Sequence, residues 1–262
     1  MSRLFFAAMV VLTLGAHSSS AAPAGLMPAG SLRASFIATN PVQGMVDGKT
    51  GEVRGPASDL TRELAARLGV AGKVTPVNGV QGVLQAVKNG EADIGFLAYD
   101  PGRAVEVDYS QTYSLAQNTF MVLESSPLKS VKEIDRPGTS IGVTEGDTGD
   151  LYLKRTLKNV AFKRNKDGDM ELALKMLRAG EIEAYGTNRQ RLYELAQNNP
   201  GLRLLPDNFY GVPQAIIVKK GNKPLLEIVD RMLDDARSSG LIAASISRVG
   251  LVGVDVAPPR AK

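Results

Sequence analysis

The stretch VLQAVKNGEADIG, residues 83–95, has a counterpart later in the chain, ALKMLRAGEIEAYG at residues 173–186. Each stretch has the pattern of an amphipathic helix that ends at a glycine, Gly90 or Gly180, and is followed by glutamate and a short apolar strand. Both stretches close a series of predicted elements in the order strand, helix, strand, helix, strand. This repeated order predicts two α/β lobes with largely parallel sheets, because a match of every element in order is hard to explain by chance.

The predicted elements occupy equivalent places in the two copies. In the first copy, the strands are 31–38, 73–77 and 92–98, and the helices are 58–70 and 82–90. In the second copy, the strands are 139–144, 160–163 and 182–186, and the helices are 149–157 and 169–180. We expect Ser58 or Asp59 to cap the first helix and Gly69 to end it.

One extended apolar run, residues 117–127, connects the two copies. Another, residues 211–221, follows the second copy. Helical patterns over 223–241 and 242–251 come after them. A single crossing would join two independent domains, whereas two crossings indicate that the chain returns to complete the first lobe. We therefore predict that residues 32–120 and 217–255 form one lobe and that residues 125–212 form the other.

The first residues have the pattern of a secretory signal peptide. Arg3 precedes the apolar run LFFAAMVVLTLG and the small, polar segment HSSSAA. We predict a leader of residues 1–21, with cleavage after Ala21, and export of the mature protein. The alternative, a buried N-terminal helix, lacks the polar face that such a helix needs.

Two absences from the sequence narrow the possible chemistry. The chain has no cysteine, and its one histidine, His17, lies in the predicted leader. The mature protein therefore has no thiolate, no Ser-His-Asp triad and no histidine metal site. The basic residues are scattered over a chain of net charge +4, which argues against nucleic-acid binding, and no phosphate-loop lysine pattern indicates a nucleotide. We expect no catalytic residues, no metal and no cofactor.

Ligands of open α/β sheets bind beyond the carboxyl ends of the strands. In this chain those positions are 39–40, 78–80, 96–103, 144–148 and 186–188. Arg103 follows a buried strand and a Pro-Gly turn, which suits bidentate binding of a carboxylate. The alternative is an arginine paired with a nearby carboxylate, Asp100, Glu106 or Asp108.

A second candidate for anion binding is the turn TEGDTGD, residues 144–150, which leads from a strand into a helix. We expect Asp147 or Thr148 to cap this helix, and amides at a helix start favour an anion. The alternative is an ordinary capped helix with no ligand.

Four segments of the chain resemble the family 3 bacterial extracellular solute-binding proteins, the periplasmic receptors of polar amino acid ABC transporters. The segments are GPASDLTRELAARLGV, LQAVKNGEADIG, DPGRAVEVDYSQTY and IGVTEGDTG, and the likeness runs from about Leu32 to Gly250. The resemblance implies a two-lobed periplasmic-binding-protein clamshell of type II with two hinge strands. It also implies that Arg103, helped by backbone near Ala98, binds the ligand α-carboxylate and that Thr148 binds it from the second lobe.

Departures from the family pattern bear on the ligand. Thr39 and Val80 stand near positions that carry ligand-stacking aromatics in many members, and Phe96 and Ala98 stand where serine is common. Asn188 stands near the acid that pairs with the ligand ammonium. A buried ammonium without a partner charge is costly. These departures predict an acid that lacks an α-ammonium, unless Glu145, Asp147 or Tyr185 replaces the missing charge.

The function expected from sequence is capture of a small carboxylate-bearing solute, amino-acid-like or an organic acid, by a monomer that delivers it to an ABC permease. Hinge closure around the ligand is the implied mechanism. One alternative is an enzyme on the same scaffold that resembles the periplasmic cyclohexadienyl dehydratases. Another is a receptor that signals through a membrane partner.

Overall fold

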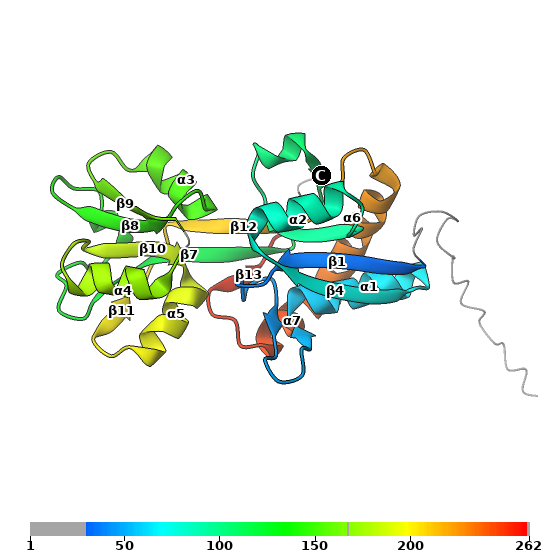
Figure 1. Cartoon of the computed structure of the whole chain (residues 1–262), viewed down its shortest axis with the longest axis horizontal. Coiled ribbons are helices and arrows are strands. Elements are labelled where there is room, and N and C mark those ends of the chain that lie inside the picture. The colour runs from blue at the N-terminus through cyan, green and yellow to red at the C-terminus, as the bar shows by residue number, and fades with distance from the viewer. Residues whose placement is uncertain (1–29, 167, 261–262) are drawn as a thin grey trace, which may run out of the picture.

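The computed structural model describes residues 30–166 and 168–260 of the chain. Figure 1 shows these residues as two lobes, joined by long strands that run from one lobe into the other. The predicted leader, residues 1–21, lies outside the described residues. Among the described helices, none has the length and apolar composition needed to cross a bilayer.

The first lobe is built on the first copy of the repeat. Its elements are β1 (Ser31–Ile37), the hairpin β2 (Met45–Val46) and β3 (Val53–Arg54), α1 (Pro56–Leu68), β4 (Ala71–Val77), α2 (Gly79–Lys88), β5 (Ile94–Ala98), the short 3-10 helix η1 (Arg103–Val105) and β6 (Val107–Tyr109). Strand β1 pairs in parallel with β4 and with β5. Strand β12 (Tyr210–Lys219) then runs antiparallel beside β5 and β6, which gives the order β4-β1-β5-β12-β6.

The second lobe repeats this arrangement. Its elements are the 3-10 helix η2 (Val131–Glu133), β8 (Ser140–Thr144), α3 (Thr148–Thr156), β9 (Ala161–Asn165), α4 (Met170–Arg178), β10 (Ala184–Asn188), α5 (Arg189–Asn198) and β11 (Leu202–Leu204). With β7 (Ser114–Leu123) as the antiparallel strand, the order is β9-β8-β10-β7-β11. Each strand has its equivalent in the first lobe, so the predicted duplication of βαβαβ is confirmed.

The strands β7 and β12 are the two crossings between the lobes. They pair with each other from Ser114–Gln214 to Asn118–Tyr210. Beyond this shared segment, β7 continues along β10 and β11, and β12 continues along β5 and β6. Both strands are buried for most of their length, which explains why each reads as an apolar run. The fold is the two-lobed clamshell with two hinge strands that the sequence predicted.

The chain returns to the first lobe after β12. It forms α6 (Lys223–Ser238), α7 (Leu241–Arg248) and β13 (Val254–Val256), and β13 pairs with the start of β7. Leu225 and Met232 of α6 share one apolar cluster with Leu32 and Leu60 of the first copy. This packing supports our proposal that residues 32–120 and 217–255 form one lobe and residues 125–212 the other.

The predicted cap of α1 is wrong. The helix begins earlier, at Pro56, and Gly55 precedes it with a φ of 99° and no side-chain cap. Proline suits the first helical position because its φ is already helical and the missing N–H has no partner there in any case. Asp59 lies inside the helix instead, where it accepts hydrogen bonds from Ser245 and Arg248 of α7.

Candidate ligand-binding site

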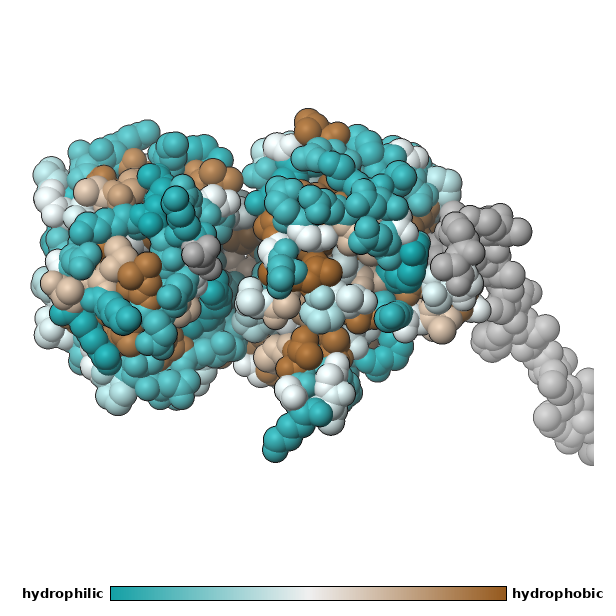
Figure 2. Space-filling view, viewed as in Figure 1, coloured by the Kyte–Doolittle hydropathy of each residue, from teal (hydrophilic) through white to brown (hydrophobic). Residues whose placement is uncertain are grey.

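A pocket of about 160 Å³ lies between the lobes, at the carboxyl ends of β1, β5, β8 and β10. In the space-filling view the lobes meet at a furrow (Figure 2). The lining residues are Ile37, Thr39, Asn40, Ala98, Ala116, Asn118, Thr144, Asp147, Thr148, Gly149, Thr187, Asn188, Arg191, Val212 and Gln214. They come from the first lobe, from both hinge strands and from the second lobe, so a change in the angle between the lobes changes the pocket.

The start of α3 forms one wall of this pocket. Asp147 caps the helix, as the sequence predicted, because its side chain accepts the amide of Asp150 at 2.7 Å. The side chain of Asp150 in turn accepts the amide of Gly146 at 3.0 Å. Within the described residues, no acceptor engages the amides of Thr148 and Gly149. These two amides are the anion-binding donors that the helix start has left.

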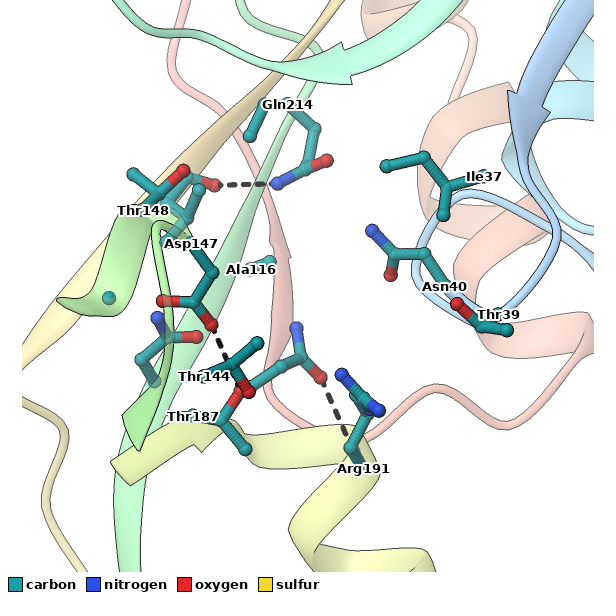
Figure 3. Close-up of a pocket in the computed structure, with 15 residues that line it drawn as sticks. Ile37, Thr39, Asn40, Ala116, Thr144, Asp147, Thr148, Thr187, Arg191 and Gln214 are labelled. Carbon is teal, nitrogen blue, oxygen red and sulfur yellow. Dashed lines mark hydrogen bonds between the residues drawn. The ribbon is translucent and has the colours of Figure 1, made fainter. Parts of the chain in front are cut away.

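Asp147 is the one carboxylate among the described residues that line the pocket. Burial raises its pKa to about 6, while the hydrogen bond from the Asp150 amide acts in the opposite direction. The Thr187 hydroxyl donates to the second carboxylate oxygen at 3.4 Å (Figure 3). A carboxylate with a raised pKa is one whose negative charge is incompletely compensated, so it favours a ligand cation or a proton beside it.

The start of α5 forms a further part of the second-lobe wall. Asn188 caps this helix, and its side-chain oxygen accepts the amides of Gln190 and Arg191 at 2.9 and 3.3 Å. The Asn188 side chain therefore presents N–H donors to the pocket, because its acceptor is already used. Arg191 points its guanidinium into the gap on the side of Asn40 and Thr39 (Figure 3).

Five of the residues predicted from sequence are brought together in the pocket: Thr39, Ala98, Asp147, Thr148 and Asn188. The structure places the other three elsewhere. Phe96 is fully buried and packs edge-on against Tyr113, with ring centroids 6.1 Å apart. Val80 packs beside the apolar cluster of α2 and β5, and Arg103 stands just outside the lining.

Arg103 is half-buried in η1, and its guanidinium donates to the carbonyl of Ala98 at 3.4 Å. The sequence left open a pairing with Asp100, Glu106 or Asp108. Within the described residues no ion pair joins Arg103 to any of them, because Glu106 and Asp108 pair with lysines and Asp100 accepts the Arg103 backbone amide. The guanidinium thus sits beside a lining residue, and its charge acts on the neighbouring Tyr109, whose hydroxyl donates to the same Ala98 carbonyl.

Several lining residues were not predicted from sequence. Among them, Arg191 has the largest number of hydrogen-bond donors and a positive charge. It lies in α5, which we did not predict. The signal was present, because Asn188 is a good cap and Leu192, Leu195 and Ala196 have helical spacing. Asn118 and Gln214 were missed because they lie inside the apolar runs of the hinge strands.

A sequence profile of the bacterial extracellular solute-binding proteins, family 3, matches residues 32–249. The chain belongs to this family. The predicted family membership is thereby confirmed for nearly the whole described chain.

Among known proteins with a similar sequence, the glutamine-binding protein of Geobacillus stearothermophilus is 27% identical over 184 residues, which are 69% of this chain and 69% of the relative. The ABC transporter glutamine-binding protein GlnH of Bacillus subtilis is 24% identical over 201 residues, 75% of this chain and 72% of the relative. Among solved structures, an ancestral arginine-binding protein bound to glutamine has a TM-score of 0.67 and 26% identity, and the match covers 84% of this chain and 98% of that one.

A second solved structure is the ancestral amino acid-binding protein AncCDT-1, described as a precursor of cyclohexadienyl dehydratase. It has a TM-score of 0.68 at 23% identity, with 85% of this chain and 96% of that one covered. At this identity the likeness supports the family 3 fold alone.

Within the described residues, no group of three or more His, Cys, Asp or Glu side chains is arranged to hold a metal ion.

Proposed function

We propose that this protein captures a small carboxylate-bearing solute in the periplasm and delivers it, as a monomer, to an ABC permease. The observation that carries the proposal is the inter-lobe pocket of a family 3 chain, lined from both lobes and both hinge strands. A ligand that contacts both walls binds the closed form more tightly than the open form and therefore shifts the population toward closure. The permease then recognises the closed form.

The amides of Thr148 and Gly149 are our proposed second-lobe donors to the carboxylate, and Arg103 is the proposed first-lobe donor. Binding is favoured over catalysis because the curated relatives are named as binding proteins. A receptor that signals through a membrane partner would use the same pocket in the same way. Transport assays in cells that lack the protein distinguish the two roles.

The first test is a thermal-shift screen of the mature protein. The panel contains the twenty standard amino acids, their 2-hydroxy, 2-oxo and N-acyl analogues, dicarboxylates, sugars and polyamines. A ligand present at about a thousand times its Kd adds roughly 4 kcal/mol of stability. We expect at least one carboxylate to raise the Tm by roughly 5–15 °C. A shift with a sugar or polyamine and with no carboxylate would contradict the proposal.

The second prediction concerns Asp147, which we propose as the partner of any ligand ammonium. Such a ligand needs the ionised carboxylate, so its affinity should fall about tenfold between pH 7.5 and pH 5, as the group with a pKa near 6 takes up a proton. A deaminated analogue meets like-charge repulsion from the same carboxylate, so its affinity should rise over this range. Calorimetry at the two pH values measures both slopes.

The control is Asp147→Asn, which keeps an acceptor for the Asp150 amide and is an equally good cap residue. It should abolish both slopes. If amino and deaminated ligands respond to pH in the same direction, Asp147 is not the ammonium partner. The sequence-based preference for an acid without an α-ammonium stays a prediction, which the same comparison of ligands at pH 7.5 decides.

A further inference from the structure

Arg191 differs from its neighbour Arg189 in how few hydrogen bonds its guanidinium makes. Its neighbour Arg189 makes one hydrogen bond to Asn208 and three to backbone carbonyls of residues 205–207. Arg191 makes one, from Nη2 to the carbonyl of Gly168 at 3.0 Å. Within the described residues, no ion pair involves Arg191. A guanidinium has five N–H donors, so most of its capacity is open to the pocket.

The position of Arg191 in the pocket also supports a role in ligand binding. Arg191 is the one cationic side chain among the described residues that line the pocket, and it points into the gap (Figure 3). It lies in the first turn of α5, which has no acidic residue, and a cation at the positive end of a helix is electrostatically unfavourable. The donors of Asn188 are on the same wall, because the Asn188 oxygen is held by two backbone amides. This corner of the pocket therefore offers N–H donors and positive charge. The charge of Arg191 acts on Asp147 and lowers its pKa, but the two side chains form no ion pair in the described part of the chain.

A second buried donor lies along the same wall. Asn118 is 4% exposed and lines the pocket, and the structure shows no hydrogen bond from its side chain to any described residue. Its register places it opposite Asn188 on the neighbouring strand. Its amide nitrogen lies 3.0 Å from where a side-chain carbon on Gly149 would be, so it adjoins the start of α3. Since the side chain lines the pocket and makes no hydrogen bond to a described residue, its N–H donors are available to a ligand acceptor.

We propose that Arg191 and the Asn188 amide bind a second anionic group of the ligand, while the α3 amides, Asn118 and Arg103 bind the first. Arg191 is then a specificity-determining residue, and the ligand is a compound with two acidic groups. This inference rests on the proposed function. Charge-assisted hydrogen bonds to a guanidinium give a carboxylate the advantage over an amide of the same shape.

The test uses pairs of compounds that differ by carboxylate against carboxamide at one end. The pairs are L-glutamate with L-glutamine, L-aspartate with L-asparagine, and glutarate with its monoamide. Calorimetry on the mature protein should show at least about a tenfold preference for the carboxylate in one pair. In Arg191→Gln the preference in that pair should fall below about threefold, and in Arg191→Lys, which keeps the charge, it should be intermediate.

Arg136→Gln is the matched control, because Arg136 is a second-lobe arginine outside the pocket that pairs with Glu183. It should leave the preference unchanged. Equal binding of carboxylate and amide by the unmodified protein overturns the inference, and so does a preference that survives in Arg191→Gln.

The thermal-shift screen distinguishes failure of the inference about Arg191 from failure of the proposed function. If monocarboxylates bind and a second acidic group gives no gain, the inference about Arg191 fails and the proposed function stands. If no carboxylate of any kind binds, both fail. If Arg191→Gln melts more than a few degrees below the unmodified protein without ligand, Arg191→Lys supplies the comparison. The intermediate preference expected of Arg191→Lys supports the inference, and a preference equal to that of the unmodified protein overturns it.

Discussion

Replacing Asp59 by alanine should destabilise the protein by about 2–3 kcal/mol. The Asp59 side chain is 6% exposed and joins α1 to α7, because it accepts from the Ser245 hydroxyl at 2.6 Å and from Arg248 at 2.8 Å. Ser245 is fully buried, so alanine at position 59 leaves its hydroxyl without a partner. Differential scanning calorimetry should show a fall in Tm of roughly 5–10 °C.

The two exposed arginines that pair with Asp59 provide the control variants. Arg62 and Arg248 also pair with Asp59, but their side chains are 70% and 55% exposed, so Arg62→Ala and Arg248→Ala should each cost less than about 1 kcal/mol. Asp59→Asn keeps an acceptor for Ser245 and should fall between these variants and Asp59→Ala.

The same variant tests the proposed division into lobes. If residues 217–255 complete the first lobe, Asp59→Ala should increase amide hydrogen exchange in α1, α6 and α7 and leave α3, α4 and α5 protected. If exchange became faster over residues 139–198 and not in α1, α6 and α7, the division would be contradicted. The result also matters for the hinge, because β13 follows α7 and pairs with the start of β7.

The duplicated fold could be predicted from sequence because its signals are local and strong. The helices α2 and α4 each have an apolar stripe and a glycine just after their end, and Gly90 and Gly180 do adopt the positive φ that favours glycine at such a position. The buried strands follow at once. Two copies of the same order then reinforce each other, since an accidental pattern has no reason to occur twice.

The short strands β6, β11 and β13 could not be predicted in this way. Each has three residues, too few for an alternating pattern to stand out. They are strands because β12 or β7 lies beside them and supplies hydrogen-bond partners. This pairing is a tertiary property, and the local sequence does not contain it.

The site was predicted in part, and the reason is again geometric. Strand ends of parallel sheets identify Thr39, Ala98, Thr148 and Asn188, because any residue after such a strand lies at the same edge. Arg191 was missed because the helix that carries it, α5, was not predicted, and Asn118 and Gln214 were missed because they lie inside apolar runs. The sequence placed Phe96 at the site, whereas the structure places it in the core.

Arg103→Ala should lower the affinity for a carboxylate ligand at least a hundredfold, about 2.7 kcal/mol. The guanidinium lies beside Ala98 and makes no ion pair in the described part of the chain, so it is free to bind the ligand carboxylate. Without ligand, the Tm should change by no more than a few degrees, because the side chain is half-buried and makes one long hydrogen bond. Arg103→Lys keeps the charge but loses bidentate geometry, and we expect about a tenfold loss.

Because Arg103 stands just outside the lining, its effect should appear in closure as well as in affinity. Small-angle X-ray scattering at saturating ligand should show a smaller radius of gyration for the unmodified protein and no contraction for Arg103→Ala. Arg62→Ala, at an exposed position of α1, should behave like the unmodified protein in both measurements. Affinity within threefold of the unmodified protein would mean that the second-lobe donors, the amides of α3 among them, hold the carboxylate without Arg103. An unfolded Arg103→Ala would instead assign the arginine to the stability of the first lobe, since the turn at Asp100 that accepts its backbone amide would then depend on its side chain.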